Sequence, residues 1–173
     1  GKMKWVILGI IVIIIAVAVV LAVNEMQFAY EIEEIKEINY VTLEQDNKYG
    51  VIDKTGKIVV EPTYNGIQIP NPSKPVFICI GEYDKEAKEY DTKAFNDKGE
   101  QLFSEYDKIE TISVETNIET TPYEKSTLIY RKNGKYGLIT LEGKQITEPI
   151  YEEINSINYK EGTFAVKFEG KFG

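Results

Sequence analysis

Residues 48–64 read Lys-Tyr-Gly-Val-Ile-Asp-Lys-Thr-Gly-Lys-Ile-Val-Val-Glu-Pro-Thr-Tyr, and residues 135–151 restate this phrase with the same spacing. An aromatic-glycine pair opens each copy, a polar turn ending in Gly-Lys follows, and Glu-Pro and a tyrosine close it. Residues 170–173, Gly-Lys-Phe-Gly, open the phrase once more. A repeat that cannot bury its own apolar face stacks on its neighbours, so this phrase sets the architecture.

Each phrase is expected to begin with a β-hairpin. Residues 127–137 match residues 163–173, and residues 40–50 fit the same frame. Between the two strand-like runs of each copy stand residue types that tolerate positive φ and favour a tight turn. These pairs are Asp46-Asn47, Asn133-Gly134 and Glu169-Gly170.

A second turn follows the hairpin in each copy, and a glycine ends it. Gly56, Gly99 and Gly143 occupy this position, where we expect the left-handed backbone that glycine adopts without strain. A tyrosine comes next in each copy, and we expect it to pack in the core with its hydroxyl hydrogen-bonded at the edge. An isoleucine follows each tyrosine by three residues. These residues are Tyr64, Tyr106 and Tyr151, and Ile67, Ile109 and Ile154.

The fold class that follows is mainly β, an array of repeated antiparallel β-hairpins behind a single N-terminal hydrophobic α-helix. The β-repeat domain is expected over residues 39–173, with units at about 39–70, 75–112 and 126–158 and the start of a fourth at 162–173. In the degenerate middle unit, the charged insert of residues 82–91 predicts a solvated loop, with a recognition site as the less common alternative. Residues 111–125 predict a linker or an edge strand with an acidic surface.

The N-terminal segment predicts a membrane span. Residues 5–23 are uninterruptedly apolar and, as a helix, reach about 28 Å, close to the hydrocarbon thickness of a bilayer. Lys2 and Lys4 precede this run and no basic residue follows until Lys36, so the positive-inside rule places residues 1–4 in the cytoplasm and the bulk outside. A cleaved signal peptide with a small-residue site at residues 20–22 is the alternative.

The helix is expected to continue as an amphipathic stalk over residues 24–38. Phe28, Ile32 and Ile35 fall on one face of it among glutamates. This face needs a partner, either the following domain or another subunit, and the three residues are candidate partner contacts.

Composition excludes several classes of function. The chain has 28 acidic and 20 basic side chains and no histidine, so it repels nucleic acid and lacks the commonest general base and metal ligand. Its single cysteine, Cys79, lies in an apolar stretch and is expected to be a small buried hydrophobe. Glu61 and Glu148 recur at equivalent positions, which indicates a shared structural role rather than a catalytic pair. We therefore predict no enzyme activity, no cofactor and no metal site.

Three tyrosines lie outside the repeat frame in charged segments. Tyr83, Tyr90 and Tyr123 are accordingly the better candidates among the aromatic residues for contact with a partner.

The phrases at residues 48–64 and 135–151 resemble the WG repeat of bacterial proteins, with tyrosine or phenylalanine in place of the tryptophan that names it. The second half of the frame recurs at residues 92–109, so the resemblance covers roughly residues 39–173. It implies an all-β array, often on envelope proteins, that supports interactions and carries no general catalytic site. The unfinished fourth unit leaves two alternatives: the chain continues in nature, or the last strand completes the sheet of the first unit.

Two functions remain open. The first is a non-enzymatic, membrane-anchored envelope protein whose repeat domain binds another envelope protein or a surface polymer. The alternative is a structural subunit of a pilin-like filament or other assembly, self-associated through its N-terminal hydrophobic helix. Lys2 and Lys4 are awkward in a filament core, and the glutamate that pilins carry near the start of the helix is missing, since Trp5 stands there.

Overall fold

The computed structural model describes residues 1–28, 37–114, 123–158 and 163–172. The chain divides into two compact units, Gly1–Glu31 and Ile32–Gly173. The first unit holds a single helix and the second holds β-strands, and each is described by itself.

Helix α1 spans Lys2–Phe28. From Trp5, at 75 % of full exposure, to Ile15, at 57 %, its described side chains are apolar and exposed. Within the described part of the chain, no helix meets the length and hydropathy required to cross a membrane. The side chains from residue 16 onward lie outside the described set, so the span over residues 5–23 stays a prediction. Most of the predicted stalk, residues 29–36, also lies outside the described residues.

The second unit is built from thirteen strands in the described residues. They are β1 (Tyr40–Gln45), β2 (Lys48–Asp53), β3 (Ile58–Tyr64), β4 (Gly66–Gln68), β5 (Phe77–Asp84), β6 (Glu89–Phe95), β7 (Gln101–Leu102), β8 (Lys108–Ser113), β9 (Tyr123–Lys132), β10 (Lys135–Thr140), β11 (Glu153–Asn158), β12 (Thr163–Phe168) and β13 (Lys171–Phe172).

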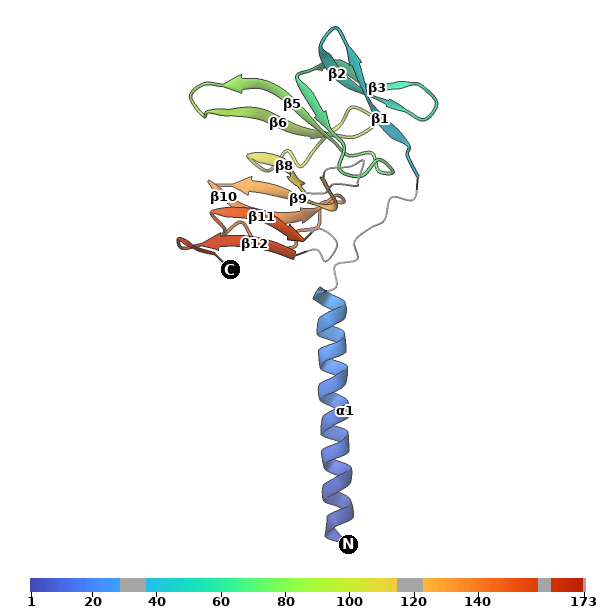
Figure 1. Ribbon diagram of the computed structural model, residues 1–173, viewed down its shortest axis with the longest axis vertical. Helices are drawn as coiled ribbons and strands as arrows, with labels where there is room; N and C mark the ends of the chain where they lie inside the picture. The colour runs from blue at the N-terminus through green and yellow to red at the C-terminus, as the bar shows by residue number, and fades with distance from the viewer. Residues whose placement is uncertain (29–36, 115–122, 159–162, 173) are drawn as a thin grey trace. The chain divides into compact units, whose positions relative to one another are not determined.

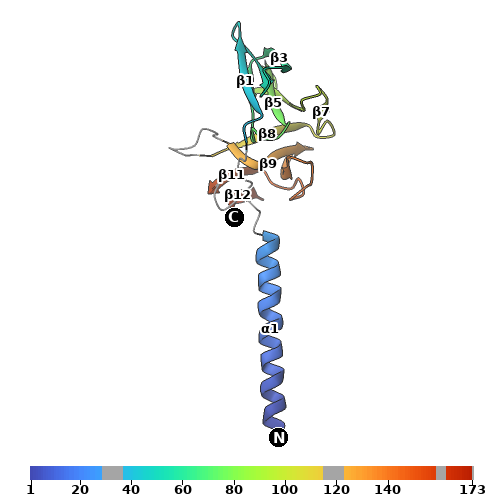
Figure 2. The ribbon, with the colours of Figure 1, turned by 90° about the vertical axis from the view of Figure 1, so that its right-hand side faces the viewer.

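These strands form four small antiparallel sheets, with orders β1-β2-β3, β4-β5-β6-β7, β10-β9-β8 and β11-β12-β13. The sheets follow one another in chain order, as both views of the ribbon show (Figures 1 and 2). The structure thus confirms a mainly β fold of repeated antiparallel hairpins.

The sheets do not coincide with the sequence units. The strand that follows the repeat tyrosine leaves its own unit and pairs with the first hairpin strand of the next one, as β4 does with β5, β8 with β9 and β11 with β12. The unit limits predicted from the sequence therefore cut across the sheets. At the other end, β13 pairs with β12, so this last described strand closes its own hairpin rather than completing the first sheet.

The hairpin turns are those that the sequence predicts. Two residues with positive φ separate the strands at each of the three sites, which is the type I′ geometry that matches the twist of the flanking strands. The φ values are 52° and 60° at Asp46 and Asn47, 52° and 74° at Asn133 and Gly134, and 48° and 75° at Glu169 and Gly170.

The second turn is also confirmed, in all three units. Gly56, Gly99 and Gly143 have φ values of 86°, 75° and 88°. Each donates its N–H to the carbonyl three residues earlier, on Asp53, Asn96 and Thr140 respectively. The side-chain oxygen of that same earlier residue accepts a backbone N–H from within the turn. The middle unit, degenerate in sequence, therefore keeps the geometry of its neighbours.

Each hydrophobic cluster lies between two successive sheets. Val51 and Val60 of the first sheet pack with Phe77 and Cys79 of the second. The second and third sheets meet in a larger cluster and the third and fourth in a smaller one: Val76, Ile78, Ala94, Ile109, Leu128, Tyr130, Ile139 and Leu141, then Ile112, Leu138 and Ile154. The sheets bury their apolar faces against one another, as stacked repeats must.

The repeat tyrosines are half-buried at the margins of these clusters rather than inside them. Tyr64, Tyr106 and Tyr151 each pack against a different cluster. The hydroxyl of Tyr106 accepts a hydrogen bond from Gln145 at 3.1 Å. Of the isoleucines, Ile109 and Ile154 are buried and Ile67 packs from the margin. Cys79 is 1 % exposed, as predicted, and burial raises the pKa of its thiol to about 12.

The prediction for residues 111–125 is correct in part. Strand β8 runs to Ser113 and is an edge strand of its sheet, β9 begins at Tyr123, and residues 115–122 lie outside the described set. The expected acidic surface is wrong at Glu124, which is only 2 % exposed. Its carboxylate accepts hydrogen bonds from the backbone N–H and the hydroxyl of Ser126, both at 2.9 Å, and these bonds make the burial tolerable.

Replacing Gly56 by valine is expected to lower the free energy of unfolding by about 1–2 kcal/mol, because a Cβ disfavours the left-handed backbone. A Cβ at Gly56 would meet no atom within 4 Å, so the loss isolates the backbone term. Gly56→Asn is the matched control and should lose less, because asparagine tolerates this conformation. Urea unfolding of the full chain measures both variants, and equal stability of Gly56→Val and the parent would contradict the assignment.

Candidate functional site

The tip of the β5–β6 hairpin is the most distinctive surface of the repeat domain. Residues 82–91, predicted to be a solvated loop, instead continue the hairpin, with Tyr83 opposite Tyr90 and Asp84 opposite Glu89. The Asp84 carboxylate accepts the N–H groups of Glu86 at 2.8 Å and Ala87 at 3.0 Å, which holds the turn. The insert is therefore an ordered extension of a strand pair.

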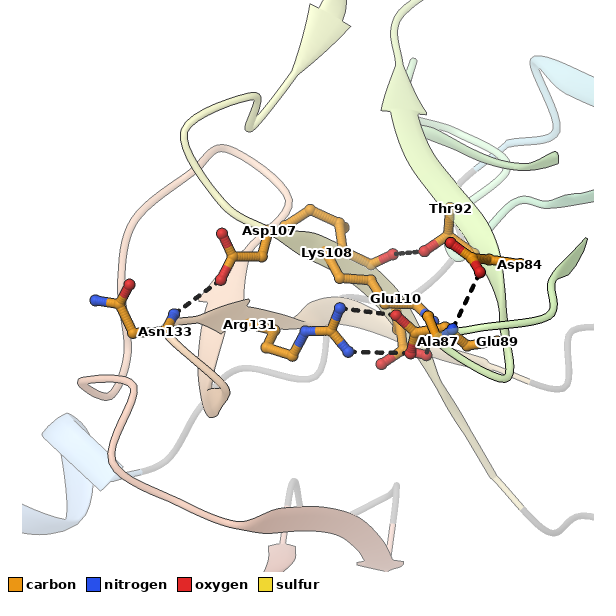
Figure 3. A network of polar contacts seen from close by, with 10 residues as sticks. Asp84, Ala87, Glu89, Thr92, Asp107, Lys108, Glu110, Arg131 and Asn133 are labelled. Atoms are coloured by element: carbon orange, nitrogen blue, oxygen red, sulfur yellow. Dashed lines mark hydrogen bonds and ion pairs between the residues drawn. The ribbon is translucent and has the colours of Figure 1, made fainter. Parts of the chain in front are cut away.

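An ion-pair network ties this tip to the next sheet (Figure 3). Glu89 lies between Arg131 and Lys108, which are opposite one another on β9 and β8. The guanidinium of Arg131 donates to both carboxylate oxygens of Glu89, at 2.8 and 3.0 Å, and the Lys108 ammonium donates to one of them at 3.0 Å. A bidentate arginine–carboxylate pair of this kind fixes orientation as well as adding energy.

The same cations determine the charge state of Glu89. The hydrogen bond from Arg131, and then that from Lys108, lower the pKa of Glu89 to about 2. Burial opposes this effect, and it is incomplete, since the Glu89 side chain is 30 % exposed. Lys108 is only 8 % exposed and has a second, looser partner in Glu110 at 3.5 Å. Glu89 is thus a fixed anion throughout the physiological range and is poorly suited to transfer protons.

Two further hydrogen bonds lie near this network. One joins the second sheet to the third, and the other lies within the third. Thr92 on β6 donates its hydroxyl to the Ile109 carbonyl at 2.9 Å, and Asn133 donates its N–H to the Asp107 carboxylate at 2.8 Å (Figure 3). The tip and β8 are held in one arrangement by side chains from both sheets.

Open clefts lie on the surface around the tip. One cleft, of about 410 Å³, is lined by Tyr83, Tyr90 and Lys108 and by five carboxylates. Its carboxylates are Glu82, Asp84, Glu89, Asp91 and Asp107. A second, of about 490 Å³, shares Tyr83, Tyr90 and Lys108 and reaches Glu110 and Ser113. The tip therefore presents aromatic rings beside an acidic hollow.

Tyr83 and Tyr90, predicted from the sequence as contact residues, are brought together. Their rings pack edge to face with centroids 5.1 Å apart, and the residues are 48 % and 50 % exposed. Tyr123 lies apart from them, half-buried at the start of β9 opposite Ser113. Ile32 and Ile35 lie outside the described residues, as does the side chain of Phe28.

The structure places Glu61 and Glu148 in separate parts of the repeat domain. Glu61 lies on β3 and Glu148 follows β10, and both are exposed. Within the described residues, no group of three potential ligands could hold a metal ion.

The sequence reasoning missed Glu89, Lys108 and Arg131, which make up the network. A signal was present, because Arg131 is the only arginine of the chain. Arginine among so many lysines indicates a need for planar, bidentate pairing that lysine cannot provide. The partner could not be named, because it lies 42 positions away.

The comparisons with known proteins bear on the repeat. The family described as WG containing repeat matches residues 49–70 and 136–172. These two segments of the chain are WG repeats. These matched segments cover β2 to β4 and β10 to β13. The middle unit is not matched, although its Asn96–Gly99 turn has the same geometry as the turns that end at Gly56 and Gly143. Comparison with curated proteins and with solved structures finds no match.

Replacing Glu89 by glutamine is expected to lower the free energy of unfolding by about 1.5–3 kcal/mol near pH 7, because both cations lose a charged acceptor. Glu110→Gln is the matched control and should cost less than about 1 kcal/mol, because this carboxylate is 39 % exposed and 3.5 Å from Lys108.

The pH dependence distinguishes charge from shape. The pKa of Glu89 is about 2 in the folded chain against an ordinary value of 4.5, so its stabilising effect is complete above about pH 4.5 and is lost as the pH falls toward 2. The difference in unfolding free energy between the parent and Glu89→Gln should shrink over this window in urea titrations. A difference that stays constant down to pH 2 would contradict the role assigned to the charge.

Proposed function

We propose that this chain is a non-enzymatic, membrane-anchored cell-envelope protein whose extracytoplasmic WG-repeat domain binds another envelope protein or a surface polymer through the β5–β6 tip. The observation that carries this proposal is the Tyr83–Tyr90 pair, half exposed on a hairpin that Glu89 clamps to the next sheet. Exposed aromatic residues on an ordered support lose little conformational entropy on binding, and they are enriched where proteins meet partners.

The charge around the tip narrows the chemistry of the ligand. Five carboxylates and one lysine line the first cleft, so a ligand with cationic groups is attracted and a nucleic acid is repelled. The tyrosine faces can also stack on a cation or on an apolar surface. A basic segment of an envelope protein, or a surface polymer that carries amino groups, fits both features.

The anchor is proposed from α1. Its exposed apolar side chains, from Trp5 to Ile15, and the lysines at its start support a single span with the N-terminus in the cytoplasm. A pilin-like filament packed through the same helix would use the same apolar surface. We favour the membrane-anchored binding protein over the filament subunit, because the ordered β5–β6 tip offers a surface for a partner.

Removing both rings by Tyr83→Ser and Tyr90→Ser together should abolish most of the binding. The full chain, kept in mild detergent, is immobilised and exposed to envelope extract, and the retained protein or polymer is quantified. We expect at least a roughly tenfold loss for the double variant, as two central aromatic contacts disappear, and a weakening with added salt.

Phe168→Ser is the matched control, because Phe168 is similarly exposed at 45 % but lies on β12. Retention of the same ligand by the double variant at the level of the parent would exclude the tip. Turnover of a substrate by the parent chain, with no retained ligand, would reverse the non-enzymatic assignment.

The orientation is tested on intact cells that produce the chain. Protease added outside should digest residues 39–173, because the positive-inside rule places this domain on the outer side. Permeabilised cells provide the control that the domain is cleavable. Full protection in intact cells together with cleavage after permeabilisation would contradict the proposed orientation.

A further inference from the structure

One hydrogen bond recurs wherever two units of the array join. The residue after the repeat tyrosine donates its N–H to a carbonyl on the first strand of the next hairpin. The three bonds are Asn65 to Ile80 at 2.8 Å, Asp107 to Arg131 at 2.9 Å and Glu152 to Lys167 at 2.7 Å. The repeat isoleucine, two residues further on, then lies opposite the preceding residue of the hairpin strand, as Ile109 lies opposite Tyr130 and Ile154 opposite Val166.

Among the described residues, no such strand lies beside the first hairpin. Strand β1 corresponds to β5, β9 and β12, but it forms the outer edge of its sheet (Figure 2). In the shared frame of residues 40–50 and 127–137, Glu44 takes the place of Arg131, and Leu43 that of Tyr130. The Glu44 carbonyl is therefore the acceptor of a recurring bond whose donor is missing among the described residues.

The backbone of β1 is oriented to make that bond. Gln45 and Lys48 flank a two-residue turn, so they exchange hydrogen bonds, and the bonded pairs alternate along the ladder. Leu43 and Val41 consequently bond to β2, whereas the N–H and C=O groups of Thr42 and Glu44 point away from it. On this edge the described residues supply bonds only to the start of the strand, where Asn39 and Tyr40 donate to the Pro72 carbonyl.

The side chains of β1 are also less covered than those of the corresponding strand β9. Leu128 and Tyr130 of β9 are fully buried, and β8 lies along their strand. Val41, the counterpart of Leu128, is 45 % exposed. An added strand would shield Val41 and Leu43 and satisfy the outward polar groups of β1.

We propose that β1 accepts an antiparallel strand of the form Tyr-x-x-Ile from the WG-repeat array of a partner protein. The residue after the tyrosine donates to the Glu44 carbonyl, and the isoleucine lies opposite Leu43. In the chain itself, the three strands that follow the repeat tyrosines Tyr64, Tyr106 and Tyr151 are engaged with β5, β9 and β12, so the donor is a strand of this kind left free in another array. This surface is separate from the β5–β6 tip, so the two proposals stand or fall independently.

The probe is a blocked synthetic peptide with the sequence of residues 105–113, Glu-Tyr-Asp-Lys-Ile-Glu-Thr-Ile-Ser, added to the full chain in mild detergent. Amide hydrogen exchange is followed by NMR. Without peptide, the Thr42 and Glu44 amides should exchange fast and those of Val41 and Leu43 slowly. With saturating peptide, the Thr42 and Glu44 amides should slow by roughly tenfold or more, as each gains a hydrogen bond.

Thr42→Pro removes the outward N–H while leaving the ladder to β2, a substitution that edge strands tolerate. It should weaken peptide binding roughly tenfold, the equivalent of one or two hydrogen bonds, while Val41 and Leu43 stay protected. Thr42→Val keeps the N–H and should bind as the parent does, and a peptide with aspartate in place of Ile109 should not bind.

Three outcomes would overturn the proposal. The first is slow exchange at Thr42 and Glu44 without peptide, which would mean that the chain covers its own edge. The second is unchanged exchange at saturating peptide. The third is equal affinity of folded Thr42→Pro and Thr42→Val. If Thr42→Pro fails to fold, the exchange data on the parent chain and the aspartate peptide decide the question.

Discussion

The contact between successive sheets is the constraint on which the rest of this structure depends. No sheet has enough strands to enclose a core of its own, so each buries its apolar face against the next. The clusters around Val51, Tyr130 and Leu138 all lie at such boundaries. The recurring turns follow from this constraint, because a strand that reverses one residue early or late would present the wrong face to its neighbour.

The transfer of one strand from each unit to the next sheet strengthens the same boundary. Apolar contact between sheets is not directional, whereas a strand that pairs across the boundary fixes the register of the two units. The recurring bond to Ile80, Arg131 and Lys167 is the local expression of this transfer. The network around Glu89 adds a second, polar link at the boundary between the second and third sheets, where the hairpin is longest. Its bidentate geometry favours one arrangement of the tip over others.

The elements that could be predicted from the sequence are those that local chemistry determines. Gly56, Gly99 and Gly143 have the predicted φ because only a residue without Cβ adopts it freely, and Asn133-Gly134 makes the expected turn for the same reason. The burial of Glu124 was not predictable, because it depends on which strands pair in space. The sequence identified Tyr83 and Tyr90 as contact candidates but not their pairing. The charges of residues 82–91 suggest a loop, and the two tyrosines lie opposite one another only because the β5–β6 ladder continues through this segment.

The two surfaces to which we assign binding both arise where the array departs from its own repeat. In the middle unit, an insertion lengthens a hairpin, and its two aromatic rings stay about half exposed beside the next sheet. At β1, no described strand takes the place that β4, β8 and β11 take beside the later hairpins. Exposed edges are usually blocked by charges or proline, but β1 itself contains one charged side chain, Glu44, and no proline. An edge with so little protection is open to pairing with another strand, and the recurring bond within the chain indicates which kind of strand fits beside β1.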